Sequence, residues 1–279
     1  MQPVISINGK LVSRKQATLS VFDNSLLYAE GLFESVLAVE DRLIFGQGHL
    51  ARLQDGAKAI GLRVPVGAKQ LYNWMVTAVK KHPAPVKKVR LTISAGESAA
   101  WSGRAGKPQI IIIVTEHELP TKPFRLLVSS LRVDQLSSLR QVKTLSYVLQ
   151  SIALKEARAK EYDDSLLLNQ KSQVAEITSA NIWWVKSGVI MTPPLGAGCL
   201  PGVTRAVLIR EIGRLGLKLA EKETTLDAML KADELFLTSS LKLVLPIGEV
   251  SDGALHRRFE IGPITERLAK HLRGLAGLS

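Results

Sequence analysis

The chain has 279 residues, of which 46% are hydrophobic, enough to build one large domain or two smaller ones. Its formal net charge is +12 at pH 7, yet the only notable clusters of basic residues are Lys80-Lys81 and Lys87-Lys88. A nucleic-acid surface usually concentrates its basic residues in one patch, so we expect no nucleic-acid partner. An anionic substrate and a solvated basic exterior both remain open as explanations of the charge.

Cys199 is the only cysteine, which excludes an intrachain disulfide and suits a reducing compartment, so we expect a cytoplasmic protein. Residues 1–9 lack the charged and apolar segments of an export signal, and no apolar run approaches the ~20 residues that a membrane span needs. The five histidines do not have metal-ligand spacing. We therefore expect neither a membrane partner nor a metal.

Residues 1–117 predict a small α+β domain. The dipeptide Asn8-Gly9 favours a type I′ turn and therefore a hairpin, because both of its residues accept positive φ angles. A second hairpin is expected between 33–39 and 42–45. Apolar residues at helical spacing and runs of β-branched residues predict the other elements. These are helices over 48–60 and 70–80 and strands over 89–93 and 109–115.

Two prolines and little apolar content identify residues 118–123 as a linker. Residues 124–279 then predict a larger α/β domain. Its expected strands are 124–133, 165–168, 182–185, 189–191 and 234–237. Its expected helices are 145–160, 203–215 and 261–272.

Lys143 is the most informative residue for chemistry. It lies in the segment RQVKTLSY at 140–147, which we expect to open a helix. A lysine that loses hydration among apolar neighbours can present a neutral amine that attacks an aldehyde. The alternative is a solvated surface lysine, because the chain contains 37 Lys and Arg residues.

Pyridoxal phosphate needs an amine, an acidic group for the pyridinium nitrogen and N–H groups for the phosphate from a protein. Besides the amine of Lys143, the sequence offers candidates for the other groups. Glu176 offers the acidic group, with an exposed loop carboxylate as the alternative. Residues 200–204 lead into a helix whose first N–H groups suit a phosphate, and the alternative is an ordinary helix start. Arg52 and the hydroxyls of 238–240 offer further phosphate contacts, and the alternatives are an exposed helix arginine and a plain strand end.

Other cofactor and nucleophile motifs are absent from the sequence. No Gly-x-Gly-x-x-Gly follows a predicted strand, no Gly-Lys-Ser/Thr phosphate loop occurs, and no Gly-x-Ser-x-Gly elbow occurs. We therefore disfavour dinucleotide binding, nucleoside-triphosphate binding and hydrolase chemistry.

The order of these pieces resembles the class IV, or D-alanine-aminotransferase-like, pyridoxal-phosphate enzymes of fold type IV, from about residue 5 to 247. The resemblance implies a two-domain fold with the cofactor at the domain interface, and a homodimer. The segments that carry it are YAEGLFE (28–34), HLARL (49–53), YDDSLLL (162–168), VAE (174–176), SANI (179–182), TPPL (192–195), PGVTR (201–205) and ADELFLT (232–238).

By this resemblance Lys143 would be the catalytic residue, holding pyridoxal 5′-phosphate as a Schiff base and moving protons. Glu176 would pair with the pyridine nitrogen of the cofactor. Phe33 would form a wall of the substrate pocket, with a plain core aromatic as the alternative. The phosphate would be bound by Arg52, Val203, Thr204 and Ser240.

Within the family, three comparisons favour one reaction. Branched-chain aminotransferases typically have an arginine where this chain has Leu37, and D-amino-acid aminotransferases an Arg-x-His where it has Ala95-Gly96-Glu97-Ser98. The segments SSLK (239–242) and NIWW (181–184) are most similar to 4-amino-4-deoxychorismate lyases. We therefore expect a lyase that forms 4-aminobenzoate and pyruvate. An aminotransferase for D-amino or branched-chain amino acids is the alternative, and a cofactor-free basic binding protein is a remote one.

Overall fold

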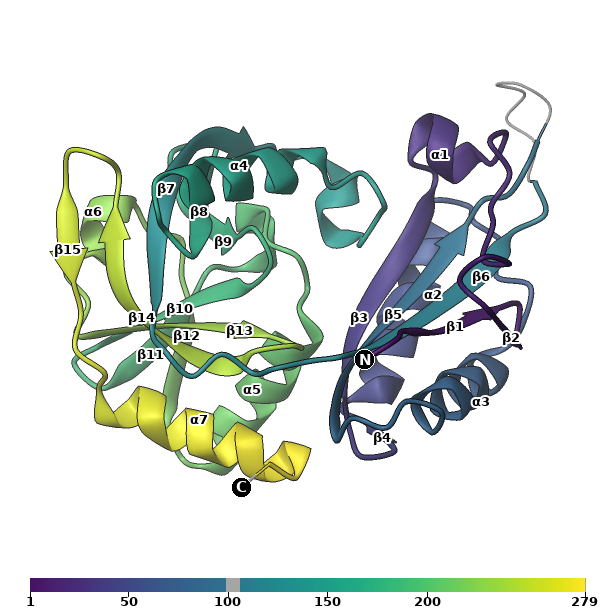
Figure 1. Ribbon diagram of the computed structural model, residues 1–279. Helices are drawn as coiled ribbons and strands as arrows, with labels where there is room; N and C mark the ends of the chain where they lie inside the picture. The colour runs from purple at the N-terminus through teal and green to yellow at the C-terminus, as the bar shows by residue number, and fades with distance from the viewer. Residues whose placement is uncertain (99–105, 279) are drawn as a thin grey trace. The chain divides into compact units, whose positions relative to one another are not determined.

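The computed structural model describes residues 1–98 and 106–278 (Figure 1). The chain divides into two compact units, each with its own sheet. Unit 1 comprises Met1–Leu119 and Val142–Ser146, and unit 2 comprises Pro120–Gln141 and Tyr147–Ser279. The functional domain boundaries at 117 and 124 stay a prediction. Both units combine helices with a sheet, so the expected mixed α/β class is confirmed.

Unit 1 is built on a six-stranded antiparallel sheet in the order β2-β1-β6-β5-β3-β4. The turn between β1 and β2 contains Asn8 and Gly9 with φ angles of 50° and 82°, which confirms the predicted hairpin. The strands are β1 (Val4–Ile7), β2 (Lys10–Val12), β3 (Gly31–Val39), β4 (Arg42–Leu43), β5 (Val86–Ser94) and β6 (Gln109–Glu116).

Helices α2 (Gly46–Ala59) and α3 (Ala68–Val79) cover one face of this sheet, and the short helix α1 (Asn24–Tyr28) precedes β3 (Figure 1). The core under the helices takes every second residue of the strands, for example Val89, Leu91 and Ile93 of β5. Because successive strand side chains point to opposite faces, Phe33 and Arg90 lie on the face away from α2 and α3.

The segment around Lys143 makes an isolated antiparallel bridge to β3 of unit 1. The N–H of Phe33 donates to the carbonyl of Lys143 at 3.1 Å, the N–H of Leu145 donates to the carbonyl of Gly31 at 2.9 Å, and Thr144 bridges to Leu32. These pairings occupy the β3 edge that β5 leaves open, and they account for the membership of Val142–Ser146 in unit 1. The prediction that a helix begins at 145 is wrong, because the backbone of this segment bonds to β3.

Unit 2 contains a nine-stranded mixed sheet in the order β12-β11-β10-β13-β14-β7-β8-β9, with β15 paired to β14. The contacts of β7 with β8 and with β14, and of β11 with β12, are parallel, whereas the others are antiparallel. The strands are β7 (Phe124–Val133), β8 (Asp164–Asn169), β9 (Val174–Ile177), β10 (Asn181–Lys186), β11 (Val189–Thr192), β12 (Lys218–Glu221), β13 (Glu234–Ser239), β14 (Leu243–Ser251) and β15 (His256–Arg258).

The core of unit 2 contains Trp183 stacked on Phe236, with ring centroids 5.7 Å apart and both side chains fully buried. Val148 and Ile152 lie at helical spacing with the buried Ala153 and Ala157, yet they are 67% and 43% exposed. The helices are the 3-10 turns η1 (Ser138–Gln141) and η2 (Leu195–Ala197), and α4 (Val148–Ala159), α5 (Val203–Arg214), α6 (Leu226–Met229) and α7 (Pro263–Ala276).

Two features are absent from residues 1–98 and 106–278. No helix there has both the length and the apolar character to cross a membrane. No group of three or more His, Cys, Asp or Glu side chains there could hold a metal ion.

Candidate active site

Lys143 lies beside an aromatic ring in unit 1. Its Nζ is 4.3 Å from the centroid of the Phe33 ring, and the guanidinium of Arg90 is 4.1 Å from the same centroid. A cation held against the face of a ring is attracted by the ring quadrupole. The sheet and the segment bridged to it therefore bring an amine, an aromatic ring and a guanidinium together. That Phe33 forms a wall of a substrate pocket stays a prediction.

Arg90 is a site candidate that motif comparison misses. It lies in β5 between Val89 and Leu91, both fully buried under the helices, and its register partner on β3 is Ser35. The signal in the sequence is the alternation of basic or polar residues with apolar ones over 87–93, which predicts a strand with one polar face. A planar guanidinium with parallel N–H donors suits a substrate carboxylate.

Arg52 is held by a buried carboxylate on the helix side of the same sheet. Its Nε donates to Glu34 Oε1 at 2.8 Å and its Nη2 to Glu34 Oε2 at 2.5 Å, and Nδ1 of His49 is 2.6 Å from Oε2. Glu34 is 1% exposed and the Arg52 side chain 12% exposed. The alternative of an exposed helix arginine is therefore wrong, and the guanidinium is fixed in orientation. Its role toward phosphate stays a prediction.

The electrostatics of this cluster favour an ionised glutamate. Burial by itself raises the pKa of Glu34, but the charge of Arg52 and the hydrogen bonds from His49 and Arg52 outweigh it and lower the pKa to about 2. Burial lowers the pKa of His49, so its imidazole is neutral at pH 7. A carboxylate only accepts hydrogen bonds, so the neutral ring donates from Nδ1.

In unit 2, Glu176 lies on strand β9 and is 6% exposed, so the alternative of an exposed loop carboxylate is wrong. Both of its oxygens are bound. Arg140 from η1 donates to Oε1, and the N–H of Leu200 donates to Oε2 at 2.8 Å. The buried carboxylate is thus ion-paired and held in one orientation.

The N-terminus of α5 belongs to the same network. The carbonyl of Leu200 accepts from Nδ2 of Asn181 at 2.9 Å. Gly202 is the N-cap of α5, and a Cβ there would lie 2.0 Å from Oδ1 of Asn181, so this close approach requires glycine. No side chain caps the helix, and its first N–H groups have no intrahelical acceptors.

Buried hydroxyls near these elements are suited to bind a ligand. Among the described residues, Oγ1 of Thr204 and Oγ of Ser239 are buried without a hydrogen-bond partner, and Thr204 is only 2% exposed. An unpaired buried hydroxyl costs about 1–3 kcal/mol. A phosphate oxygen at the α5 N-terminus would pair with the Thr204 hydroxyl and with the free N–H groups. The residues of unit 2 therefore fit a phosphate-bearing cofactor.

The predicted site residues divide between the two units. Unit 1 carries Phe33, Arg52 and Lys143, and unit 2 carries Glu176, Val203, Thr204 and Ser240. The structure brings Lys143 to Phe33, and it links Glu176 through Leu200 to the segment that leads into Val203 and Thr204. Ser240 follows two residues after Thr238, the register partner of Asn181. The roles of these residues stay predictions.

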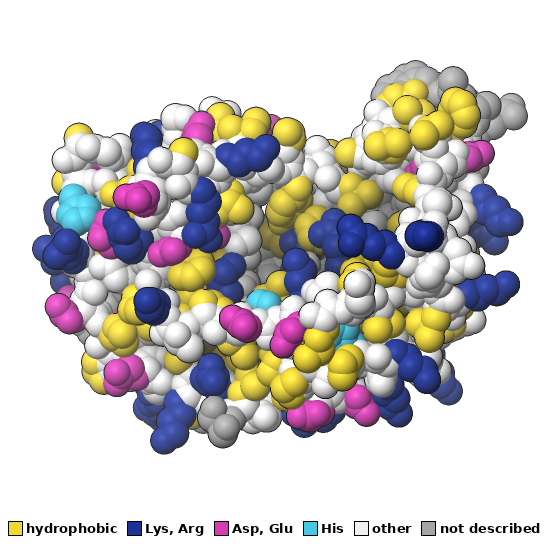
Figure 2. Space-filling view, in the orientation of Figure 1, with side chains coloured by type: hydrophobic (Ala, Val, Ile, Leu, Met, Phe, Trp, Pro, Cys, Tyr) yellow, Lys and Arg dark blue, Asp and Glu magenta, His cyan; other side chains and the backbone are white. Residues whose placement is uncertain are grey.

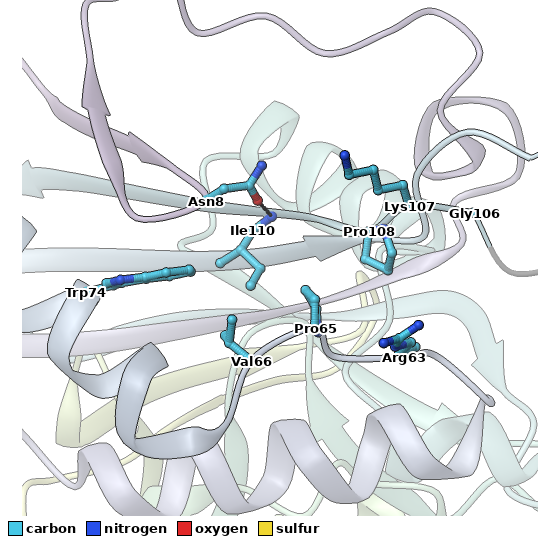
Figure 3. Close-up of a pocket in the computed structure, with 9 residues that line it drawn as sticks. All are labelled: Asn8, Arg63, Pro65, Val66, Trp74, Gly106, Lys107, Pro108 and Ile110. Atoms are coloured by element: carbon cyan, nitrogen blue, oxygen red, sulfur yellow. Dashed lines mark hydrogen bonds between the residues drawn. The ribbon is translucent and has the colours of Figure 1, made fainter.

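A separate cavity of about 530 Å³ lies within unit 1 and contains none of these residues (Figure 3). Trp74 forms one side, and Arg63 and Lys107 lie at the other side (Figure 3). Both cations are exposed. The face drawn in Figure 2 likewise shows Lys and Arg side chains interspersed with acidic, polar and hydrophobic ones. Neither feature adds to the site of the predicted chemistry.

Comparison with known proteins identifies the family. The model of the amino-transferase class IV family matches residues 31–250. A putative branched-chain-amino-acid aminotransferase of Methanocaldococcus jannaschii is 31% identical over 282 residues, which cover 97% of this chain and 96% of that protein. An aminodeoxychorismate lyase of Bacillus subtilis is 27% identical over 255 residues, which cover 89% of this chain and 87% of that protein.

A solved structure agrees with this assignment. The branched-chain aminotransferase of the archaeon Thermoproteus uzoniensis, crystallised with norvaline, superposes with a TM-score of 0.91 at 30% identity, covering 98% of this chain and 95% of that chain. The expected family resemblance, enzyme class and cofactor are therefore confirmed. The chain belongs to the class IV aminotransferase family, whose members are pyridoxal-phosphate enzymes.

Proposed function

We propose that the protein is a pyridoxal-phosphate aminotransferase that acts on branched-chain amino acids. Three relatives described as branched-chain aminotransferases, one of them as putative, match it at 30–31% identity over 96–98% of its length. The lyase relative matches at 27% over 89%, as some other branched-chain relatives also do. These comparisons favour the alternative expected from the sequence over the lyase, which becomes the second candidate.

The observation that carries the proposal is the group formed by Phe33, Arg90 and Lys143. An apolar amino acid presents a carboxylate, an amine and a hydrophobic side chain. The guanidinium of Arg90 suits the carboxylate, the ring of Phe33 suits the side chain, and the Nζ of Lys143 suits proton transfer at the carbon next to the amine. The lyase substrate carries two negative charges and would require a second cationic anchor.

Different residues of the chain would bind different groups of the cofactor. Bound pyridoxal phosphate supplies an electron sink for the bond that breaks next to the substrate nitrogen. Lys143 would hold the cofactor covalently and carry the proton, and Glu176 would accept a hydrogen bond from the protonated pyridine nitrogen. Phosphate would be bound by Arg52, the N–H groups of Val203 and Thr204, the Thr204 hydroxyl and Ser240.

We also propose a homodimer and a cytoplasmic location. The segment around α1 exposes a group of large apolar side chains, which suits contact with a second copy. The location rests on the single cysteine. The dimer is tested by sedimentation of the wild type and of a Phe22→Ser variant. The exposed residues, each at least 40% accessible, are Leu19, Val21, Phe22, Leu26, Leu27 and Tyr28.

Product analysis by mass spectrometry tests the reaction. The holoenzyme is incubated with L-leucine, L-isoleucine, L-valine or D-alanine, with and without 2-oxoglutarate, and separately with aminodeoxychorismate alone. We expect 2-oxo acids from the branched-chain substrates only when the acceptor is present. Pyruvate and 4-aminobenzoate formed from aminodeoxychorismate, without amino transfer, would reject the proposal in favour of the lyase. Amino transfer from D-alanine, with none from the three branched-chain amino acids, would reject branched-chain amino acids as the substrate class.

A further inference from the structure

Arg140 stands out because neither the predicted chemistry nor the proposed function uses it. It lies in the 3-10 turn η1, three residues before Lys143 in the sequence, and its side chain is 17% exposed. Its Nη2 donates to Oε1 of Glu176, and its Nε donates to the carbonyl of Gly198 at 2.9 Å. One guanidinium therefore connects η1, strand β9 and the loop before α5.

The second oxygen of Glu176 is held from the same loop. The N–H of Leu200 donates to Oε2 at 2.8 Å, two residues after the Gly198 carbonyl that anchors Arg140. The Glu176 side chain is 7% exposed. Arg140 and Leu200 together therefore fix both the charge and the rotation of a carboxylate that water barely reaches. If one partner of a buried ion pair is removed, the remaining charge is left uncompensated.

Two groups near Glu176, Arg205 and Cys199, do not take the part of Arg140. Arg205, a buried arginine of α5, donates to the carbonyl of Pro193 at 3.0 Å and to Glu221 at 2.8 Å. Burial raises the pKa of the Cys199 thiol to about 12, so the thiol is neutral and adds no charge. The guanidinium of Arg140 is bonded directly to Glu176.

We propose that Arg140 is a positioning residue for the cofactor. It keeps Glu176 ionised and turned so that the carboxylate can accept a hydrogen bond from the pyridine nitrogen. Without the guanidinium, a buried carboxyl favours its protonated form and loses a fixed orientation. The inference rests on the proposed role of Glu176 toward the cofactor, and it holds for either amino transfer or lyase chemistry.

The geometry requires arginine rather than any cation. Nε and Nη2 point to different acceptors, so the planar fork holds Gly198 and Glu176 at once. A lysine presents one compact charge and cannot reproduce both bonds in the same geometry. Arg140→Lys therefore keeps the positive charge and loses part of the orientation, whereas Arg140→Met loses both.

The experiment measures cofactor binding without any amino acid. Apo-protein is titrated with pyridoxal 5′-phosphate for the wild type, Arg140→Met, Arg140→Lys and the control Arg158→Met. Arg158 is also in unit 2, but its side chain is 59% exposed, and its Nη1 lies as far as 3.7 Å from Oδ1 of Asp163. We expect Arg140→Met to raise the Kd on the order of 10- to 100-fold, Arg140→Lys to recover part of the loss, and the control to change less than about twofold.

A double-mutant cycle tests whether Arg140 acts through Glu176. In a Glu176→Gln background, Arg140→Met should weaken binding by less than about twofold further, because the carboxylate that it positions is gone. The nitrogen-15 resonance of ring-labelled cofactor should shift toward the unprotonated pyridine in Arg140→Met and back toward the wild-type value in Arg140→Lys. A full additional loss in the Glu176→Gln background, or an unshifted resonance, would overturn the proposal.

A variant destabilised elsewhere in unit 2 shows whether Arg140→Met weakens cofactor binding through Glu176 or only by destabilising the unit. Leu272 of α7 is fully buried, and Leu272→Ala removes packing away from the Arg140 network. If Leu272→Ala, at an equal loss of apo-protein thermal stability, weakens cofactor binding as much as Arg140→Met does, Arg140 has no positioning role. A wild type that binds no cofactor would overturn the proposed function as well. If the wild type binds the cofactor tightly and Arg140→Met has the same Kd, only the inference about Arg140 is overturned.

Discussion

Glu34 of unit 1 and Glu176 of unit 2 are both buried strand carboxylates paired with an arginine, but their surroundings differ. Glu34 receives two bonds from Arg52 and one from His49. Glu176 receives one bond from Arg140 and one from the backbone of Leu200. In unit 1 the carboxylate fixes the predicted phosphate-binding arginine, whereas in unit 2 an arginine fixes the predicted cofactor-binding carboxylate. A glutamate–arginine pair therefore orients the arginine in unit 1 and the glutamate in unit 2.

The largest expected effect on stability comes from Glu34→Gln. The substitution leaves Arg52 buried without its counter-ion, so we expect the free energy of unfolding to fall by about 3–5 kcal/mol. Urea denaturation followed by circular dichroism measures the change, with the exposed Glu118→Gln as the control. A loss equal to that of the control would mean that the Glu34 pair does not stabilise unit 1.

Acid should break the unit 1 pair in a defined pH range. The folded pKa of Glu34, about 2, lies below its ordinary value of 4.5, so its stabilisation is complete above 4.5 and is lost as pH falls toward 2. The difference corresponds to about 3 kcal/mol. The lowered pKa of His49 acts in the same direction, beginning below pH 6.5. The free energy of unfolding, measured by denaturation between pH 7 and 3, should depend less on pH in Glu34→Gln than in the wild type. An equal pH dependence in both proteins would contradict the lowered pKa of Glu34.

Arg90→Met sharpens the comparison by removing the guanidinium that lies 4.1 Å from the centroid of the Phe33 ring. If Arg90 binds the substrate carboxylate, kcat/KM for L-leucine should fall about 10- to 100-fold, mainly through KM. The Kd for the cofactor should stay within about twofold. Steady-state kinetics and cofactor titration decide the matter together. Equal losses in both measurements would show that Arg90 supports the fold or the cofactor instead.

The smallest expected effect concerns the orphan hydroxyl of unit 2. Thr204→Val should weaken cofactor binding about tenfold, and it should leave the apo-protein as stable as the wild type or more stable, because the unpaired buried hydroxyl disappears. Thr265→Val is the matched control, since the Thr265 hydroxyl is also buried without a partner among the described residues but lies on α7. If both variants bind the cofactor equally well, Thr204 is not a phosphate ligand.

Some features were predictable because local chemistry decides them. Asn8-Gly9 forms its turn whatever surrounds it, since both residues accept positive φ. The strand Phe124–Val133 has the bounds that the sequence predicts. The family was also readable, because the order of its motifs is specific and the family model spans residues 31–250.

Other features depended on partners far away in the chain. Lys143 lies in an extended segment because β3, more than a hundred residues earlier, has an open edge that bonds to it. Glu176 lies on a strand of only four residues, too short for periodicity to reveal, and β8 pairs with it. The sequence does not single out Arg90, because its alternation with Val89 and Leu91 becomes informative only when the helices cover one face of the sheet.

By itself the amino-acid sequence determined the turns, most helices and strands, and a cofactor class, because these depend on short-range backbone preferences and on ordered motifs. Only the tertiary structure decided which face Phe33 and Arg90 share, which unit carries Lys143, and that Arg140 holds Glu176. The physical reason is that hydrogen bonds and ion pairs form between groups brought together by packing, and the distance along the chain does not encode that packing.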